Sequence, residues 1–193
     1  MARNYVIIVD KSGSMSTSDC PGGKSRWDYC QEGVNDIARK CDALDPDGID
    51  VYVFASKFKK YSNVHADMVE KIFSENEPNG STNLTDVLKD ALDNYFKHPE
   101  MPVTIVIVTD GTPDDEHSLL NLIVNTTKKM EADEQIGMTF VQVGKDAAAR
   151  NYLKKLDDGL RGLGAKFDIV DTVTFEEMEE MTISQVLENA ISD

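Results

Sequence analysis

The sequence predicts an α/β fold in which a six-stranded, mostly parallel sheet is doubly wound, with helices on both faces. Short apolar runs alternate with amphipathic helical stretches along the chain, the pattern typical of a parallel sheet covered on both sides. The two most hydrophobic runs, Tyr5–Val9 and Val103–Val108, have the length of buried strands. Ile49–Phe54 is followed so closely by Phe58–Ser62 that the two form an antiparallel hairpin. We expect the strand order 3-2-1-4-5-6, with strand 3 antiparallel.

The first strand, about Asn4–Val9, comes from the apolar run near the start of the chain. A loop rich in Ser, Gly and Pro follows as far as Arg26, and a helix is expected over Trp27–Leu44. The four residues Asp45-Pro46-Asp47-Gly48 are a turn signal that ends this helix and introduces the hairpin.

After the hairpin, a short amphipathic helix is expected over Ala66–Phe73. A polar turn at Glu77–Ser81 leads to the next helix, Leu84–Lys97, which ends before Pro99 because proline disfavours the helical conformation of the residue before it. The fourth strand, Val103–Thr109, is an uninterrupted β-rich apolar run.

The last part of the chain supplies two further strands and three helices. A helix over Glu116–Ala132 precedes the fifth strand, Gly137–Val143, and another helix follows over Ala147–Leu156. A Gly-rich segment then leads to the last strand, Phe167–Asp171, and to an acidic helix over Phe175–Ala190. No linker, repeat or shift of composition divides the chain, so we expect residues 1–193 to form a single domain.

Composition excludes several classes of partner. The net charge of −15 argues against nucleic acid and against anionic membrane surfaces, since both attract basic proteins. No run approaches the apolar length of a membrane helix, and the residues before Asp10 are too few and too polar for a signal peptide. We therefore expect a cytoplasmic protein.

The three cysteines fit reduced thiols better than a disulfide framework, because their number is odd and their spacing irregular. Cys30 and Cys41 share one face of the first helix and are expected in the core, roughly 16 Å apart by helical rise. Cys20 lies in the loop, which makes it the one candidate for exposure.

The residues best suited to binding a ligand are expected at the switch point of the sheet, where the strand order reverses. In the expected strand order, the first and fourth strands are neighbours, and ligands bind beyond their carboxyl ends. Asp10 follows one of these strands and Asp110 follows the other. Two bare carboxylates at one place repel each other, so one needs a raised pKa or a cation between them.

Three hydroxyl groups can reach the same place. Ser12 and Ser14 occupy alternating positions in the loop after Asp10, and Thr82 lies just before the Leu84 helix. Together with Asp10 and Asp110 they form an all-oxygen set, which suits Mg²⁺ or Mn²⁺ and favours Ca²⁺ less. Because only two of the ligands carry a formal charge, a metal held here keeps an open position for a carboxylate from a partner.

Three motifs resemble those of the von Willebrand factor A (vWA) and integrin I-type domains. Residues 10–14 are similar to the D-x-S-x-S motif, Gly80-Ser81-Thr82-Asn83 to the family's G-G-T-N turn, and Thr109-Asp110-Gly111 to its T-D-G motif. They follow one another in the family's order over essentially the whole chain. The resemblance implies a Rossmann-like vWA fold.

The same resemblance implies a metal-ion-dependent adhesion site (MIDAS). Ser12, Ser14 and Thr82 would bind the metal through their hydroxyls, and Asp10 and Asp110 directly or through water. The implied function is binding of a partner protein through its Asp or Glu, with no catalysis. The chain resembles small intracellular bacterial and phage vWA proteins of the tellurium-resistance and stress-operon type, and other family members work beside AAA+ ATPases.

The chain departs from the family pattern at two places. Ser81 replaces the second glycine of the threonine turn, a mild change if the backbone angles suit serine. The loop Ser16–Arg26 has no counterpart in the pattern, and we expect it to help select the partner. The acidic residues Asp114, Asp115 and Glu116 are interpreted as the start of the next helix, where the helix dipole favours them.

Three alternatives to metal-dependent binding inside the cell stay open. Each motif by itself could be an ordinary turn or helix cap. The crevice could instead carry out metal-dependent phosphoryl transfer, as haloacid-dehalogenase phosphatases do, but these need an aspartate two residues after the first, where this chain has Ser12. Extracellular adhesion fits the domain but lacks an export signal.

Overall fold

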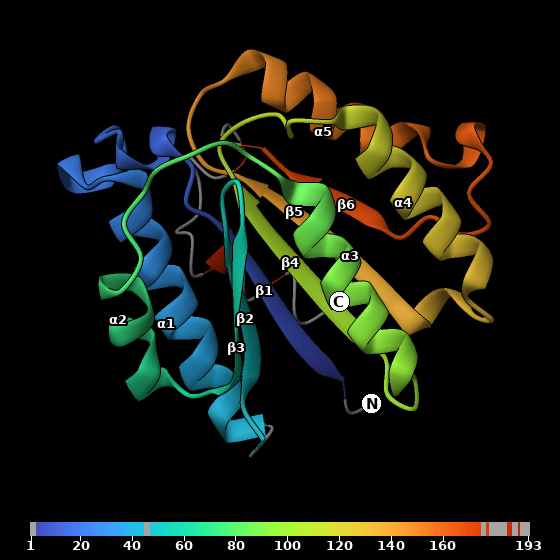
Figure 1. The fold of residues 1–193 in the computed structure, drawn as a ribbon, viewed down its shortest axis with the longest axis horizontal. Coiled ribbons are helices and arrows are strands. Elements are labelled where there is room, and N and C mark those ends of the chain that lie inside the picture. The colour runs from blue at the N-terminus through green and yellow to red at the C-terminus, as the bar shows by residue number, and fades with distance from the viewer. Residues whose placement is uncertain (1–2, 45–46, 175–176, 178–184, 187–188, 190–193) are drawn as a thin grey trace.

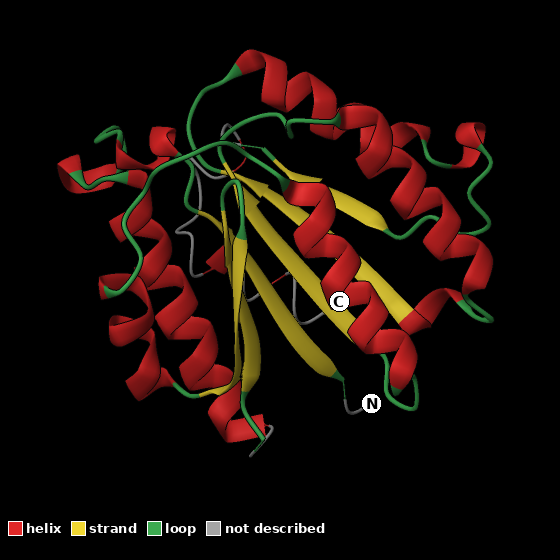
Figure 2. Ribbon diagram, in the orientation of Figure 1, coloured by secondary structure: helices red, strands yellow, loops and turns green. Residues whose placement is uncertain are grey.

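The computed structural model describes residues 3–44, 47–174, 177, 185–186 and 189, and its described strands form one sheet (Figures 1 and 2). The sheet has six strands in the order β3-β2-β1-β4-β5-β6. The strands are β1 Asn4–Asp10, β2 Ile49–Phe54, β3 Phe58–Val64, β4 Val103–Thr109, β5 Ile136–Gln142 and β6 Val170–Val173. Only β3 is antiparallel to its neighbour. The predicted fold class, strand order and direction of strand 3 are confirmed.

Helices cover both faces of this sheet, with α1 and α2 on one face and α3, α4 and α5 on the other (Figure 1). The α-helices are α1 Arg26–Leu44, α2 Ala66–Ser74, α3 Leu84–Lys97, α4 Glu116–Lys129 and α5 Ala147–Gly159. Short 3-10 turns are η1 Gly13–Ser16, η2 Pro21–Gly23, η3 Asp133–Gln135 and η4 Arg161–Leu163. None of the helices in the described ranges combines the length and apolar character that crossing a membrane requires.

Successive side chains of a strand point to opposite faces of the sheet, so the core is divided between the two faces. Along β1, Ile7 and Val9 pack against α1 and α2, whereas Val6 and Ile8 pack in the cluster beneath α3 and α4. Because both faces of β1 are buried, the strand reads as an unbroken apolar run and not as an alternating pattern. This double burial fixes the register of β1, and with it the position of the residues at its carboxyl end.

Two predicted boundaries near the carboxyl terminus are wrong. The last strand was expected over Phe167–Asp171 but covers Val170–Val173, because the segment before it is tied to the end of α4: Lys166 donates to Thr127 Oγ1 and to the Met130 carbonyl. Helix α4 ends at Lys129, before the expected Ala132, because Met130 adopts an extended conformation with its side chain buried.

The acidic helix expected over Phe175–Ala190 lies outside the described residues, apart from isolated positions.

Candidate metal site at the carboxyl edge of the sheet

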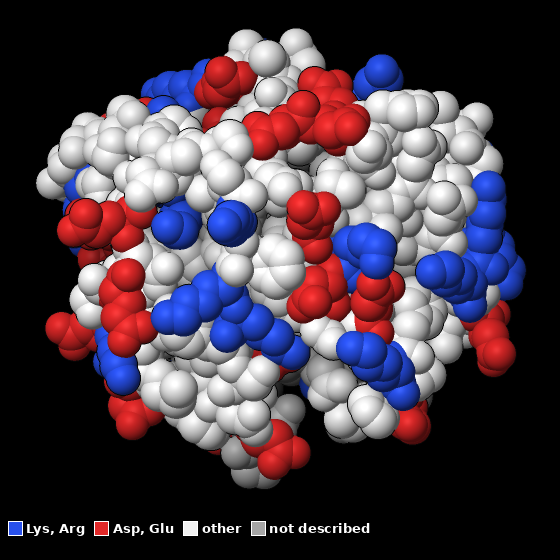
Figure 3. All heavy atoms as spheres, in the orientation of Figure 1, with Lys and Arg blue, Asp and Glu red and all other residues white. Residues whose placement is uncertain are grey.

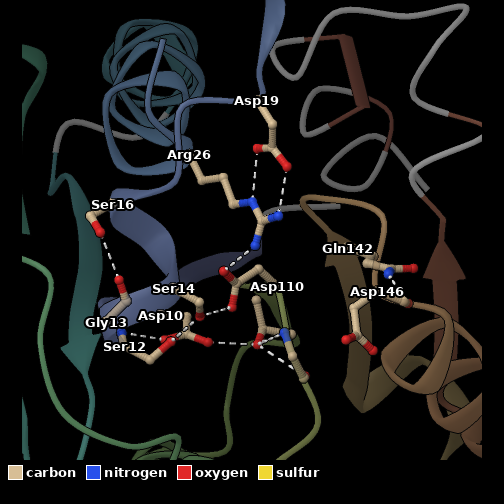
Figure 4. A network of polar contacts seen from close by, with 12 residues as sticks. Asp10, Ser12, Gly13, Ser14, Ser16, Asp19, Arg26, Asp110, Gln142 and Asp146 are labelled. Carbon is tan, nitrogen blue, oxygen red and sulfur yellow. Dashed lines mark hydrogen bonds and ion pairs between the residues drawn. The ribbon is translucent and has the colours of Figure 1, made fainter. Parts of the chain in front are cut away.

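Two carboxylates lie at the carboxyl ends of neighbouring central strands. Asp10 is the last residue of β1, and Asp110 directly follows β4, which pairs with β1 through Val9 and Val108. Both aspartates are buried, with 0% and 2% of their surface exposed. The structure therefore brings together the two carboxylates that the strand order was expected to juxtapose (Figure 4).

Among the described residues, the donors that fix Asp10 are neutral. Its Oδ1 accepts the backbone N–H of Ser12 at 2.6 Å, and its Oδ2 accepts the hydroxyl of Thr109 at 2.7 Å. Burial raises the pKa of Asp10 to about 6, and these two hydrogen bonds, which favour the charged form, only partly offset the rise. The nearby charge of Asp110 raises the pKa further. A cation beside Asp10 would relieve this penalty.

A chain of hydroxyl groups connects the loop after β1 to the second carboxylate. The Oγ atoms of Ser12 and Ser14 lie 3.2 Å apart, and the Ser14 hydroxyl donates to Asp110 Oδ1 at 2.9 Å. Ser12 is buried, whereas Ser14 is exposed. Four of the five predicted ligands thus form one cluster of polar side chains (Figure 4), and Ser14 is its exposed member.

The fifth predicted ligand, Thr82, lies on a turn that the backbone docks against this cluster. The Gly13 N–H donates to the Gly80 carbonyl at 3.2 Å, which joins the turn to the serine loop. On the other side, the Thr82 N–H donates to Asp114 Oδ1 at 3.0 Å, and the Asp114 N–H donates back to the Thr82 carbonyl at 2.9 Å. Among the described residues, no hydrogen bond joins the Thr82 hydroxyl to the other four ligands.

Asp114 has a different role from the one expected. It was assigned to the start of the next helix, but Asp115 caps that helix by accepting the Ser118 N–H at 2.9 Å. Asp114 instead fixes the Thr82 turn to the loop after β4, so it positions a predicted ligand. Sequence reasoning missed this role because acidic residues before a helix are common caps.

The serine at position 81 is accommodated without backbone strain. The left-handed conformation of the turn is carried by Gly80, with φ of +86°, whereas Ser81 is not among the residues with positive φ. A Cβ atom on Gly80 would lie 3.0 Å from Ser56 Oγ. The Ser81 hydroxyl also lies 3.1 Å from that atom. The departure from the family's second glycine therefore adds a contact and leaves the turn intact.

Arg26 is a site residue that the sequence reasoning did not identify. Its Nη1 donates to Asp110 Oδ2 at 2.7 Å, while Nε and Nη2 donate to the two oxygens of Asp19 at 2.9 and 2.6 Å (Figure 4). Only 13% of the Arg26 side chain is exposed. The hydrogen bonds to Asp19 are the largest cause of a raised pKa for the guanidinium. Asp110 therefore carries a permanent positive neighbour that Asp10 lacks.

Gly144 makes room for this guanidinium. A Cβ atom at position 144 would lie 2.5 Å from Arg26 Cζ, and the backbone there has φ of +84°, which side-chain-bearing residues rarely adopt. Position 144 follows β5 at the same edge of the sheet. The sequence does show an arginine at the start of a helix and a glycine just after a strand. Their spacing along the chain, however, does not indicate that the two residues are in contact.

The loop Ser16–Arg26 is compact. It passes through η1 and η2 and closes with a backbone bridge between Cys20 and Lys24. The predicted exposure of Cys20 is wrong: its side chain is 6% exposed because the loop folds it into the core under α1, and burial raises the pKa of the thiol to about 11. Cys30 and Cys41 are fully buried, as expected, and none of the three cysteines is in a disulfide bond.

The donors of this cluster fit a hard divalent cation. Carboxylate and hydroxyl oxygens are the ligands that Mg²⁺ and Mn²⁺ prefer. Within the described ranges, no three His, Cys, Asp or Glu side chains gather as a metal-binding group, so a metal at this edge would rest on the hydroxyls as well as the carboxylates. The residues that would hold it are Asp10, Ser12, Ser14, Thr82 and Asp110.

Comparison with known proteins identifies a family whose sequence model matches this chain. The sequence model of the von Willebrand factor type A domain matches residues 5–112. None of the curated proteins matches the sequence significantly. The solved structure of the SpRpn10 VWA domain matches with a TM-score of 0.69 and 14% sequence identity, over 98% of this chain and 95% of that chain.

Two further solved structures share the fold. A von Willebrand factor type A protein from Catenulispora acidiphila matches with a TM-score of 0.69 and 18% identity, over 97% of this chain and 42% of that one. The manganese-loaded Plasmodium vivax TRAP protein matches with a TM-score of 0.62 and 15% identity, over 98% of this chain and 73% of that one. At these identities the likeness is one of fold.

Proposed function

This chain belongs to the von Willebrand factor type A domain family, and on that premise we propose that it is a metal-dependent protein-binding module. A divalent cation at a MIDAS formed by Asp10, Ser12, Ser14, Thr82 and Asp110 binds an Asp or Glu side chain of a partner protein. The metal is Mg²⁺ or Mn²⁺, with Ca²⁺ less favoured because the ligands are few and compactly arranged. When bound, the metal supplies an electrophilic position for the partner's carboxylate.

The observation that carries the proposal is the connected cluster of oxygens that runs from buried Asp10 to exposed Ser14. The hydrogen bond from Ser14 to Asp110 and the contact between the two serines bring neutral and charged oxygens to one opening. A site intended only to stabilise the fold would be closed on all sides, whereas this one has an exposed member. The openness favours binding of a partner.

We propose binding and not catalysis at this site. Phosphoryl transfer of the haloacid-dehalogenase kind needs a second carboxylate where Ser12 lies, and the Ser12 hydroxyl is instead next to Ser14. Arg26, the cation that contacts Asp110, is held by Asp19 and Asp110 and is committed to positioning. A protein of similar fold, TRAP from Plasmodium vivax, was crystallised loaded with manganese, which supports metal binding as a use of this fold.

The proposed setting is the cytoplasm, and the narrower resemblance to the tellurium-resistance and stress-operon group stays a prediction. Three buried cysteines, none of them in a disulfide bond, suit a reducing compartment. The partner classes that the proposal favours are AAA+ ATPases and stress-operon proteins. Both are proteins, in keeping with a net charge that disfavours nucleic acid and anionic membranes.

An affinity pull-down from the source organism's lysate in Mg²⁺ and in EDTA tests the proposal. We expect a partner that is retained in Mg²⁺, released by EDTA and absent with the Asp10→Ala variant. A parallel assay with a generic phosphatase substrate should give no metal-dependent turnover. Retention that is equal in Mg²⁺ and EDTA would contradict the metal-dependent function.

A further inference from the structure

A lysine-lined groove lies beside the candidate metal site. The groove has a volume of about 350 Å³ and is bounded by the start of the serine loop, the β2–β3 hairpin and the segment before the Thr82 turn. Its lining residues are Lys11, Val53, Ala55, Ser56, Lys57, Phe58, Lys59, Asn76 and Asn79. Three are lysines and none is acidic, although acidic residues outnumber basic ones 35 to 20 in the chain. The local charge is therefore opposite to that of the protein as a whole.

The groove and the metal site share a wall. Lys11 is the residue between Asp10 and Ser12, and its carbonyl accepts the Asn79 N–H at 2.8 Å. Its own N–H donates to the Phe54 carbonyl at 2.8 Å, which ties the same residue to the end of β2. A peptide segment with one side chain on the metal would thus have the groove directly alongside it.

The lysines of the groove are largely free to meet a ligand. Within the described part of the chain, Lys11 and Lys57 make no ion pair. Lys59 lies 3.4 Å from Glu75 and 4.6 Å from the centre of the Tyr61 ring, yet its side chain is 58% exposed. Such an exposed pair is weak and can exchange partners. The groove therefore offers two lysines without an ion pair within the described residues, and a third, Lys59, whose ion pair with Glu75 is exposed.

One apolar side chain accompanies these charges. Phe58, at the start of β3, is 38% exposed and is one of few large hydrophobic residues at the described surface. β3 is the edge strand of the sheet, so the hairpin faces solvent. Figure 3 shows the basic side chains gathered over this hairpin, with acidic side chains on either side. The combination suits a partner segment that is acidic and carries an apolar residue.

We propose that the partner's metal-binding carboxylate belongs to an acidic segment, and that further carboxylates of this segment bind Lys11, Lys57 and Lys59 in the groove. The inference rests on the proposed metal-dependent function and names the chemistry of its partner. Charge complementarity in the groove favours an acidic segment there, and the acidic remainder of the surface disfavours its binding elsewhere on the molecule. Because Lys57 and Lys59 are exposed, salt should weaken their contribution more than the metal bond.

The test uses two fluorescein-labelled peptides of equal length with the full chain. One peptide carries a single Glu among Gly and Ser, and the other carries several Glu residues and one Leu. In Mg²⁺, fluorescence anisotropy should give a dissociation constant at least about tenfold lower for the Glu-rich peptide than for the single-Glu peptide. This difference in affinity between the two peptides should become smaller at high salt concentration and should stay the same in sucrose at a matched concentration.

A pair of charge-matched variants separates the groove from bulk charge. Lys57→Glu/Lys59→Glu reverses two groove lysines, whereas Lys128→Glu/Lys154→Glu makes the same change in net charge at exposed positions of α4 and α5. The groove variant should lose the tenfold preference, and the control should keep most of it. Lys57→Gln/Lys59→Gln, with a melting temperature close to wild type, should show an intermediate loss.

The outcomes distinguish the inference from the function on which it rests. Equal affinity for the two peptides in Mg²⁺, with both lost in EDTA, would overturn the acidic-segment inference and leave the metal function standing. Equal weakening by the two charge-reversed variants would overturn it too. Binding of the Glu-rich peptide that the groove variant weakens but EDTA does not would contradict the metal contact and retain the groove. Absence of binding by the Glu-rich peptide would overturn the inference.

Discussion

The β1 side and the β4 side of the candidate site hold their carboxylates in different ways. Asp10, on the β1 side, receives one backbone N–H and one hydroxyl, and burial raises its pKa to about 6. Asp110, on the β4 side, receives a hydroxyl from Ser14 and a guanidinium from Arg26 at 2.7 Å. Within the described residues, the charge of Asp10 is thus stabilised by neutral dipoles, whereas that of Asp110 faces a guanidinium that it shares with Asp19.

This difference indicates which carboxylate depends on a metal. Asp110 has a positive neighbour within the protein, although it shares Arg26 with Asp19, so its position relies less on a bound cation than that of Asp10 does. Asp10 has no such partner among the described residues, and its ionised form gains most from a divalent ion. We infer that Asp10 is the electrostatic anchor of the metal and that Asp110, held by Arg26, contributes mainly geometry.

Removal of the arginine should have the largest effect on stability. Arg26→Gln leaves Asp110 buried without its cation, and breaking one partner of a buried pair costs about 3 kcal/mol of the free energy of unfolding. Urea unfolding in EDTA measures this loss. Arg161→Gln is the control, because Arg161 lies 3.9 Å from Asp168 with its side chain 71% exposed. We expect a change of less than about 0.5 kcal/mol there. Equal losses would refute the special role of Arg26.

A substitution at Gly144 that displaces the same guanidinium should have the second-largest effect on stability. Gly144→Ala places a Cβ atom 2.5 Å from Arg26 Cζ, at φ of +84°. Gly22→Ala has a similar φ of +76° with nothing within 4 Å of the added atom, so it measures backbone strain alone. We expect strain to cost about 1 kcal/mol in both and the displaced arginine to add about 1–2 kcal/mol at position 144. Identical unfolding free energies for the two variants would contradict the packing of Arg26 on Gly144.

The charge on Asp10 should appear in the pH dependence of stability without metal. Its pKa is about 6 in the folded protein against 3.8 for the ordinary group. Since the folded state binds the proton more tightly, ionisation of Asp10 lowers the free energy of unfolding as the pH rises from 3.8 to about 6. Asp10→Asn removes this loss and should be more stable than wild type by about 1–2 kcal/mol above pH 6 in EDTA. A wild type that exceeds Asp10→Asn in stability at pH 7 in EDTA would be inconsistent with this assignment.

Thr82 should have the smallest effect on stability and a clear one on the metal. Its hydroxyl has no hydrogen bond to the other ligands, so Thr82→Ala should change the free energy of unfolding in EDTA by less than about 0.5 kcal/mol. Mn²⁺ affinity, followed by electron paramagnetic resonance, should fall at least about tenfold. Thr82→Ser keeps the hydroxyl and should restore most of the affinity. Unchanged affinity in Thr82→Ala would remove this residue from the ligand set.

Regular patterns made much of the site predictable. The apolar runs fixed β1 and β4 as buried strands, and the parallel arrangement then placed Asp10 and Asp110 at one edge. Ser12 and Ser14 occupy alternating positions in the loop after β1, which predicted that both hydroxyls lie near Asp10. These predictions depend on periodicity, which a single sequence displays.

The contacts that the sequence did not reveal depend on irregular backbone. Arg26 reaches Asp110 only because the loop before it folds through η1 and η2, and that folding has no periodic signal. The same loop buries Cys20, contrary to expectation. Asp114 was misassigned because a helix-cap pattern and a turn-fixing side chain look alike in sequence. The last strand was misplaced because Phe167, an apolar residue typical of strands, packs against the core outside the sheet.

The most direct test of the account is the melting temperature of the full chain in saturating Mg²⁺ and in EDTA, for the wild type and for Asp10→Ala. At about 100 times its dissociation constant, a metal that binds only the folded state adds about 2.7 kcal/mol, which raises the melting temperature of a chain of this size by roughly 5–10 °C. The account predicts this rise for the wild type and none for Asp10→Ala. A wild-type melting temperature that is the same in Mg²⁺ and in EDTA would contradict it.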